Sequence, residues 1–368
     1  MQRAAGPETG ILAVVKANAY GHGVTVCAPI LARAGARWLG VTCASEGLTV
    51  RKALRAEGFG DKQVDILIMC GFLPEDVAMI AENGLTPVVW TAEQIESLHI
   101  QKGLRVHVEV DTGMGRQGVL PGEPLDILLA QIASVGLVLD GIFTHFSSSE
   151  VADFEVTRRQ EKEFGAAVAR VFAAGARPEW VHAGNSSTVD NPAQEWPWLV
   201  KLAKSAGARA MVRTGLALYG YVLWIEGDAS PQIRSDLQPV MVWKSCVLSV
   251  RELAVGETVG YNAQYKALTP MRVALLPVGY ADGLRRELSS TNDKAGGWVM
   301  VGGRRAPILG RVSMNLTVVD ISEGNGGHWR VNSGDLAVIL GPGITADDHA
   351  RLAGTIAYEI VCGVHPCG

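Results

Sequence analysis

Apolar residues in the first part of the chain occur in short runs separated by longer mixed segments. Residues 11–15 form the first run, and further runs of strand length lie at residues 38–41, 65–69, 87–90, 104–110 and 137–143. Between the runs lie segments such as residues 158–174, where apolar positions recur at helical spacing. Strands that alternate with helices predict a parallel α/β architecture, and the number of runs is compatible with a (β/α)₈ barrel.

The pattern changes after about residue 235. Strand-like runs then follow one another with only turns between them, at residues 241–250, 272–277, 298–301, 316–321 and 336–340. Glycine pairs at positions 296–297 and 302–303 mark two of the turns. We therefore predict a (β/α)₈ TIM-like barrel over residues 1–235, followed by a mostly β C-terminal domain over residues 236–368.

Composition narrows the class of protein. A chain of 368 residues is long enough for two domains with separate cores, and 48% hydrophobic with 19% charged residues is typical of a globular enzyme. The net charge is −4 and like charges form no block, which argues against nucleic acid or an anionic membrane as the main partner. No apolar stretch reaches the length of a membrane span.

The six cysteines show neither a CxxC pair nor the spacing of zinc ligands, so we predict no metal site. Cys70 follows an apolar run and Cys246 lies within one, and we expect both to be buried free thiols. Free thiols are typical of a reducing compartment, so the expected location is the cytoplasm.

Lys16 directly follows the apolar run of residues 11–15, and glycines and polar residues come after it. A lysine at the carboxyl end of a buried strand can lose water and present its amine as a nucleophile, as Schiff-base chemistry requires. A lone lysine in this position more often extends to solvent along its aliphatic stem. The residues around Lys16 decide between these two interpretations.

Residues 13–23 read Ala-Val-Val-Lys-Ala-Asn-Ala-Tyr-Gly-His-Gly. This string resembles the motif that carries the pyridoxal 5'-phosphate (PLP) lysine in the alanine racemase family. The resemblance implies that PLP is the cofactor, that Lys16 binds it as a Schiff base, and that Tyr20 contacts its phosphate. Further blocks in family order extend the resemblance from about residue 11 to residue 362.

Two blocks of the predicted barrel resemble the family's cofactor site. Residues 213–220 read Arg-Thr-Gly-Leu-Ala-Leu-Tyr-Gly, and the resemblance implies that Arg213 faces the pyridine nitrogen of PLP. Arginine stays protonated, so that nitrogen would accept a hydrogen bond and remain uncharged. The implied phosphate partners are the backbone N–H groups of Gly215 and Leu216 and, in the block His-Ala-Gly-Asn-Ser, the side chain of Ser186. Without the family, the arginine would be as often a surface residue, and Asn-Ser a turn or helix cap.

Two more blocks of the barrel carry polar candidates. The block Asp-Thr-Gly-Met-Gly-Arg ends at Arg116, which the resemblance places near the PLP phenolic oxygen and the substrate carboxylate. Many relatives have a carbamate-modified lysine at the position of Glu109. We expect the Glu109 carboxylate to replace that carbamate and to orient Arg116 by a charge-assisted pair. The block Phe-Thr-His-Phe supplies His145, which by resemblance packs near the cofactor and links Arg213 to the catalytic tyrosine.

The predicted β domain carries the remaining candidates. Residues 259–265 resemble the family segment with the second catalytic base, and Tyr261 matches that base. Tyr280 lies in a Gly-Tyr-Ala-Asp-Gly signature that more plausibly shapes the site than does chemistry. Met314 matches the residue whose backbone reaches the substrate carboxylate. Many relatives have aspartate where this chain has Asn315, which removes one negative charge.

Together these blocks imply a PLP-dependent racemase that interconverts L- and D-alanine, an isomerase that supplies D-alanine for peptidoglycan precursors. Lys16 and Tyr261 would exchange protons with Cα from opposite faces, as a two-base mechanism requires. In the family the counterparts of Tyr261 and Met314 come from the partner subunit, so the resemblance implies a homodimer with shared sites. The implied small-molecule partner is an amino acid.

The two ends depart from the family pattern. The stretch ahead of Lys16 is too short for the strand and helix that usually precede it, and we expect an uncovered sheet edge. A tyrosine that often contacts the phosphate aligns with Pro366, and the usual Arg-Val-Pro-Arg segment is absent. Four alternatives stay open: a serine or broad-range racemase, a non-catalytic PLP-binding protein, a Schiff-base decarboxylase of similar layout, and an inactive relative. Tyr261 and the β domain argue against the second.

Overall fold

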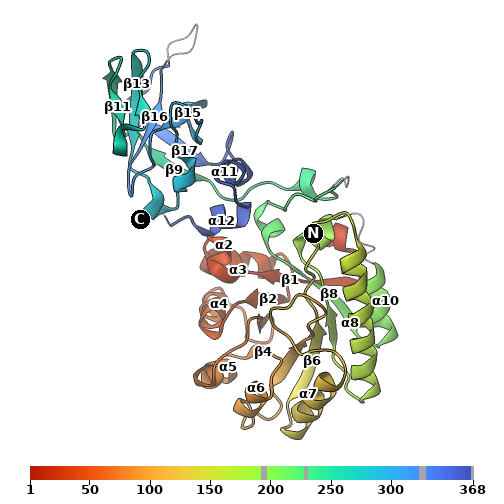
Figure 1. The fold of residues 1–368 in the computed structure, drawn as a ribbon. Coiled ribbons are helices and arrows are strands. Elements are labelled where there is room, and N and C mark those ends of the chain that lie inside the picture. Colours follow the sequence, from red (N-terminus) through yellow and green to blue (C-terminus); the bar gives the residue numbers. More distant parts are fainter. Residues whose placement is uncertain (192–196, 228–230, 323–328, 366–368) are drawn as a thin grey trace. The chain divides into compact units, whose positions relative to one another are not determined.

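The computed structural model describes residues 1–191, 197–227, 231–322 and 329–365. The chain divides into two compact units, Met1–Gln238 and Pro239–Gly368 (Figure 1). Each unit has its own sheet, and each is described here separately.

The first unit is a closed barrel of eight parallel strands, in which each strand pairs with the next and β8 pairs with β1. The strands are β1 (Thr9–Val14), β2 (Trp38–Val41), β3 (Asp65–Ile68), β4 (Leu85–Val89), β5 (Arg105–Glu109), β6 (Val138–Phe143), β7 (Trp180–His182) and β8 (Arg209–Thr214). This confirms the predicted barrel. The apolar runs after residue 37 predicted β2 to β6, whereas β7 and β8 escaped prediction because polar and apolar residues mix in them.

Helices cover the outside of the barrel (Figure 1). The main ones are α3 (Val24–Arg33), α4 (Ala44–Ala56), α5 (Val77–Glu82), α6 (Ala92–Ser97), α7 (Glu123–Ser134), α8 (Glu155–Ala173) and α10 (Pro197–Ser205). Short helical segments occur at α1 (Gln2–Ala5), α2 (Lys16–Tyr20), α9 (Ser186–Asp190), η1 (Pro74–Asp76), η2 (Leu216–Tyr219) and η3 (Arg234–Asp236). In β5, Val106 and Val108 pack in an apolar core with helix residues such as Leu128 and Phe164. The alternate residues of β5 carry polar side chains.

The barrel has no open edge among the described residues. We expected one beside the lysine strand, and this expectation is wrong. The lysine strand β1 pairs with β2 on one side and with β8 on the other, so it is itself the first of the eight strands. Closure therefore requires no strand ahead of Thr9.

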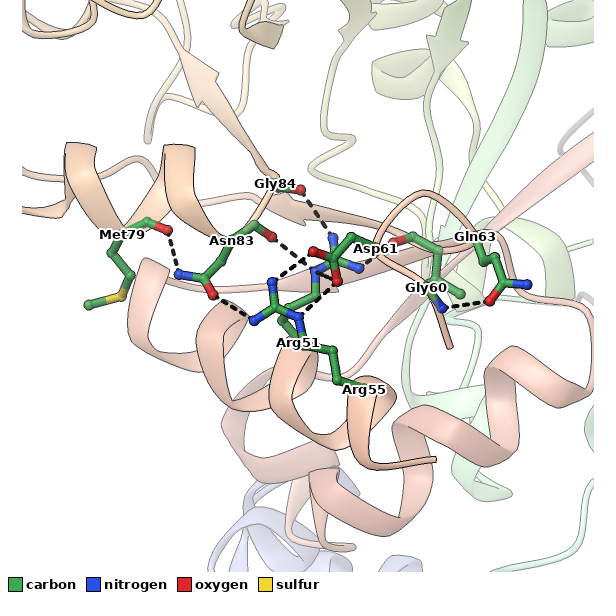
Figure 2. A network of polar contacts seen from close by, with 9 residues as sticks. Arg51, Arg55, Gly60, Asp61, Gln63, Met79, Asn83 and Gly84 are labelled. Carbon is green, nitrogen blue, oxygen red and sulfur yellow. Dashed lines mark hydrogen bonds and ion pairs between the residues drawn. The ribbon is translucent and has the colours of Figure 1, made fainter. Parts of the chain in front are cut away.

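A buried arginine of helix α4 binds the two loops that lead into strands β3 and β4 (Figure 2). The guanidinium of Arg51 donates to the carbonyls of Val64, Asn83 and Gly84 at 2.9, 3.0 and 3.1 Å. Arg55 binds Asp61 at 2.7 Å on the exposed side of the same network. Because Val64 precedes β3 and Gly84 precedes β4, a single side chain sets how both strands enter the barrel.

The second unit contains a seven-stranded antiparallel sheet in the order β10-β13-β16-β15-β14-β17-β9 and a two-stranded sheet β11-β12. The strands are β9 (Trp243–Cys246), β10 (Ser249–Leu253), β11 (Thr258–Val259), β12 (Tyr265–Lys266), β13 (Met271–Leu276), β14 (Trp298–Val301), β15 (Arg304–Leu309), β16 (Thr317–Asp320) and β17 (Leu336–Leu340). Short helical turns η4 (Tyr261–Ala263), η5 (Tyr280–Asp282) and η6 (Arg286–Leu288) interrupt them, and helices α11 (Ala346–Ala353) and α12 (Ala357–Cys362) follow. This confirms the prediction of a mostly β second part.

The run at residues 241–250, predicted as one strand, is instead two strands at opposite ends of the sheet order. The chain changes edge between Val247, whose N–H donates to Asp335, and Leu248, whose N–H donates to Leu275. Gly302 and Gly303 form the predicted turn, with φ of 56° and 78°, and connect β14 to β15 as a two-residue hairpin.

In the described part of the chain, no helix is long and apolar enough to cross a membrane. No group of three or more His, Cys, Asp or Glu side chains within these residues could hold a metal ion. Cys70 is exposed and Cys246 is half-buried, so the prediction that both thiols are buried is wrong.

Candidate active site

Lys16 begins a turn whose backbone has the wrong hand for L-residues. The next four residues have positive φ, and Ala17, Asn18 and Ala19 have φ of 52–55° and ψ of 47–51°, which is left-handed helix. An L-residue in this region costs about 1–2 kcal/mol. We predicted an ordinary loop, because among the four residues only Asn18 is of a type that favours this conformation, and a single asparagine does not indicate a left-handed turn.

Side chains from neighbouring elements hold the left-handed turn. Glu46, in the first turn of α4, accepts the N–H of Ala17 and the N–H of Thr42, both at 2.7 Å. Asn18 accepts the N–H of Val24 at 2.8 Å, which connects the turn to α3. The sequence gave no sign of the Glu46 role, since an acidic residue at a helix start is ordinary.

Backbone N–H groups converge where β7 and β8 end. Ser186 is the first residue of α9, and its hydroxyl accepts the N–H of Gly215 at 3.0 Å and that of Ala217 at 3.2 Å. We expected the N–H groups of Gly215 and Leu216 to hold the cofactor phosphate, and this stays a prediction. In the structure, the N–H groups of Gly215 and Ala217 are directed to Ser186, and Leu216 lies between them in the η2 turn.

The cradle around Gly215 requires the absence of a side chain. A Cβ at this position would overlap the hydroxyl of Tyr20, which comes from the left-handed turn. Ser187 and Thr214 adjoin Ser186 and Gly215 in the chain, and their hydroxyls are buried without a hydrogen-bond partner. Convergent N–H groups and hydroxyls are what a phosphate group needs from a protein.

Arg213 lies near the end of β8 with its guanidinium surrounded by acceptors. It donates to the Thr144 carbonyl at 2.8 Å, to His145 Nδ1 at 3.1 Å and to His182 Nδ1 at 3.3 Å, and it lies 4.7 Å from the Phe143 ring. Burial lowers the pKa of Arg213 to about 10, so the guanidinium remains charged at neutral pH.

His145, just after β6, is held neutral. Burial and then the charges of Arg213, Arg116 and Lys16 lower its pKa to about 3. Of the three cations, Arg213 is in hydrogen-bond contact with the imidazole. Because Arg213 can only donate, His145 Nδ1 accepts, and the proton of the neutral ring is on Nε2.

Glu109 does not form the direct pair with Arg116 that we expected. Its carboxylate accepts a hydrogen bond from Gln117, which sequence reasoning missed. No ion pair to Arg116 is found among the described side chains. Burial raises the pKa of Glu109, while Gln117 and the charges of Arg213 and Arg116 lower it. The two arginines therefore interact with Glu109 through space, and Gln117 makes the contact.

Asp111 shapes the loop that carries Arg116. Its carboxylate accepts the N–H groups of Gly113, Met114 and Gly115 at 2.9–3.1 Å. Val119 then returns to Glu109 by a backbone hydrogen bond of 2.8 Å. The loop after β5 is thus closed on itself, with Arg116 between its fixed ends.

The first-unit candidates all follow or end barrel strands at their carboxyl ends. Parallel strands bring these ends to one face of a barrel. The structure thus gathers Lys16 after β1, Glu109 and Arg116 at β5, His145 after β6, Ser186 after β7, and Arg213, Gly215 and Leu216 at β8.

The second unit carries the other candidates on a surface of its own. Tyr261, Tyr280, Met314 and Asn315 are exposed. Backbone contacts join their segments: the Ala281 N–H donates to the Met314 carbonyl at 2.9 Å, and a Cβ on Gly260 would touch Arg311 at 3.1 Å. Pro366, the position of the missing phosphate tyrosine, lies outside the described residues.

Comparison with known proteins agrees with this architecture. The family model for the alanine racemase N-terminal domain matches residues 1–222, and that for the C-terminal domain matches residues 240–367. The chain belongs to the alanine racemase family. The suspected family is thereby confirmed.

Several racemases of the family are similar over nearly the whole chain. Alanine racemase from Symbiobacterium thermophilum is 34% identical, covering 96% of this chain and 88% of the relative. That of Listeria innocua is 32% identical with the same coverage. Among solved structures, alanine racemase from Streptomyces coelicolor has a TM-score of 0.84 at 30% identity, covering 99% of this chain and 91% of that one.

Proposed function

We propose that this protein interconverts L- and D-alanine with PLP as cofactor. The observation that carries the proposal is the gathering of Lys16, Arg213 and the Ser186–Gly215 cradle at one barrel face. An amine for the Schiff base, a polar partner for the ring nitrogen and a phosphate-type cradle are the groups by which a protein holds PLP, and here the ring partner would be an arginine. Membership in the alanine racemase family and the names of the similar proteins support the same reaction.

We expect Lys16 to hold the cofactor by its amine, and Ser186, Tyr20 and the backbone N–H groups of Gly215 and Leu216 to hold its phosphate. When bound, PLP withdraws electrons from Cα of the substrate and makes its proton acidic. Arg213 would donate toward the ring nitrogen, and because its guanidinium is charged at neutral pH that nitrogen would stay uncharged. Arg116 would bind the substrate carboxylate.

Two bases on opposite faces of Cα are needed for racemisation. Lys16 would exchange the proton on one face and Tyr261 that on the other. A phenol needs help to act as a base at neutral pH. The Nε2–H of neutral His145 would stabilise a phenolate oxygen by donating to it, and the charge of Arg213 would act in the same direction.

We further propose that the site is completed in a homodimer, where the partner subunit presents Tyr261 and the backbone of Met314. The exposure of Tyr261 (66%) and Met314 (55%) on the second unit supports this, because both residues are accessible to a partner subunit. Tyr280 and Asn315 would line the same surface. Relatives often have a negatively charged aspartate at the position of Asn315, and this difference, with that at Pro366, makes serine the second candidate substrate.

We expect the predicted barrel domain, residues 1–235, to bind the cofactor. The predicted β domain, residues 236–368, would supply the second base. The described cysteines are free thiols, which favours work in the reducing cytoplasm.

The proposal is tested by incubating the purified protein with PLP and L-alanine in D₂O and following D-alanine and deuterium at Cα. We expect labelled D-alanine from the wild type and from Lys52→Ala, and none from Lys16→Ala. L-serine run in parallel measures the substrate range. PLP absorbance without either D-amino acid would refute the racemase and leave a PLP-binding protein.

A further inference from the structure

A chain of polar side chains crosses the barrel interior beneath the candidate site. From Arg213 Nη1 it passes to His182 Nδ1 at 3.3 Å, from His182 Nε2 to His107 Nδ1 at 2.9 Å, and from His107 Nε2 to Asp140 Oδ2 at 3.4 Å. The four residues lie on β8, β7, β5 and β6. Both histidines are completely buried and Asp140 is 7% exposed, so water does not compete for these contacts.

The neighbouring residues are shaped to hold the imidazole rings. Gly141 lies directly against His107, where a Cβ would approach ring atoms to 2.5 Å. Trp38 packs on the other side of His107 with ring centroids 5.0 Å apart. Phe143 stacks on His182 at 4.5 Å and also lies under the Arg213 guanidinium. Each ring is therefore oriented by an aromatic neighbour.

Arg213 at one end of this hydrogen-bond chain and Asp140 at the other determine which atom donates and which accepts in each hydrogen bond. Arg213 has only donors, so His182 Nδ1 must accept. Burial lowers the pKa of both histidines, so each ring is neutral and carries one proton. The His182 proton is then on Nε2 and is donated to His107 Nδ1. The His107 proton is in turn on Nε2 and is donated to the Asp140 carboxylate, which can only accept.

We propose that Asp140 and His107 are positioning residues for Arg213, because through this directional hydrogen-bond chain they keep His182 Nδ1 an acceptor for the guanidinium. The proposal rests on the proposed function, in which Arg213 faces the cofactor ring. Neither residue is among those proposed above to bind substrate or cofactor. Their effect reaches Arg213 only through the proton position on His182.

Disrupting the hydrogen-bond chain removes the acceptor that keeps the His182 proton on Nε2. Without an acceptor at His107, the His182 proton can move to Nδ1, where it faces the Arg213 N–H. Two donors then oppose each other, and the guanidinium retains only the Thr144 carbonyl and His145 as acceptors. Arg213 would then adopt a second orientation.

The test uses the full chain labelled with ¹⁵N-histidine, because the side-chain nitrogen shifts show which ring nitrogen carries the proton. Spectra are recorded with and without PLP. We expect the Nε2–H form of His182 and His107 in the wild type. In Asp140→Ala and His107→Phe, His182 should shift toward the Nδ1–H form. Asp140→Asn, which can still accept through its amide oxygen, should restore the wild-type pattern.

Asp65→Asn is the matched control. Asp65 pairs with Arg105, which also contacts Asp140 at 3.5 Å, but Asp65 makes no hydrogen bond to His107 among the described contacts. The control removes a carboxylate beside the chain and should leave His182 unchanged. In the PLP-loaded enzyme, we expect kcat of Asp140→Ala to fall about 10-fold or more, as is usual when a tautomer-fixing partner is lost, with KM for L-alanine within about twofold of wild type.

An Nδ1–H form of His182 in the wild type would overturn the proposal, as would an unchanged Nε2–H form in both disrupted variants. If only one of these variants folds, its spectrum decides. A wild type that makes no D-alanine, but whose His182 tautomer responds as expected, would refute the racemase while retaining the hydrogen-bond chain.

Discussion

The hydroxyl of Tyr20 occupies the space that any side chain at position 215 would need. Gly215 is therefore fixed by a close approach and not by its φ, which an L-residue can adopt. The contact connects the left-handed turn after β1 with the end of β8, so that the lysine turn and the phosphate-type cradle form one structure.

Gly215→Ala should consequently weaken cofactor binding while the barrel remains folded. The new methyl group displaces Tyr20 or the backbone at Ser186, and overpacking of this kind typically costs 1–3 kcal/mol, or about 5- to 150-fold in affinity. Titration of the PLP absorbance measures the change. Gly165→Ala, in the open middle of α8, is the control and should bind PLP as the wild type does.

A neutral His145 makes the protein sensitive to acid. Its pKa is about 3 in the folded state, whereas an unfolded histidine has a pKa near 6.5. Below pH 6.5 the unfolded chain binds a proton that the folded chain does not, so stability falls as pH falls toward 3. The slope from one such group is at most about 1.4 kcal/mol per pH unit.

Urea unfolding at pH 7 and pH 5 tests this linkage. We expect stability to decrease toward pH 5, and to decrease less in His145→Asn, which has no group to protonate. His99→Asn, at an exposed position, should leave the decrease as it is in the wild type. Equal decreases in all three proteins would contradict a neutral His145.

At the scale of elements, Arg51 stabilises the entry of β3 and β4. Arg51→Met removes the donor for three backbone carbonyls and leaves them buried, so we expect a loss of about 3–5 kcal/mol in barrel stability. Arg55→Ala breaks an exposed ion pair and should cost less than about 1 kcal/mol. Hydrogen exchange of the β3 and β4 amides localises the effect, and similar exchange in both variants would refute it.

How far the sequence predicts an element depends on how uniformly the element is buried. Strand β3 is a continuous apolar run and was predicted nearly to its ends, whereas β8 mixes Arg209 and Arg213 with apolar residues and was missed. The barrel interior here is polar, so alternation conceals strands. The same alternation was an unused signal: Arg105, His107 and Glu109 share one face of β5, and Asp140 is a carboxylate inside an apolar run.

The site could be proposed from the sequence only where a motif resembles the family, as for Lys16, Arg213 and Ser186, since each of these residues taken alone favoured an ordinary structural role. It was not predictable where a long-range contact decides. Gln117 at Glu109 and Glu46 at the lysine turn depend on which loops meet, and no local spacing contains that information.

At the scale of the whole molecule, the proposed sharing of sites between subunits predicts how much activity two inactive variants recover when they form mixed dimers. Lys16→Ala and Tyr261→Ala should each be inactive as homodimers. After subunit exchange of an equal mixture, half of the dimers are mixed, and each of these has one intact site of two. The activity should recover to about a quarter of the wild-type value.

D-alanine formation measured before and after exchange tests this prediction. A mixture of Lys16→Ala with Arg213→Ala, both in the first unit, is the control and should not recover. Failure of the first mixture to recover, with exchange verified by mass, would place Lys16 and Tyr261 of one subunit in the same site.

The left-handed turn has a consequence for protein chemistry. Ala17 is an exposed L-residue with the backbone angles that a D-residue prefers. A synthetic peptide of residues 1–26 with D-alanine at position 17, ligated at Cys27 to the remaining chain, should raise stability by about 1–2 kcal/mol in thermal unfolding. The same exchange at the fully buried Ala19 should not, since its methyl group would move into packed neighbours. The proposed product of the reaction is thus also the residue that best fits the turn beside the reactive lysine.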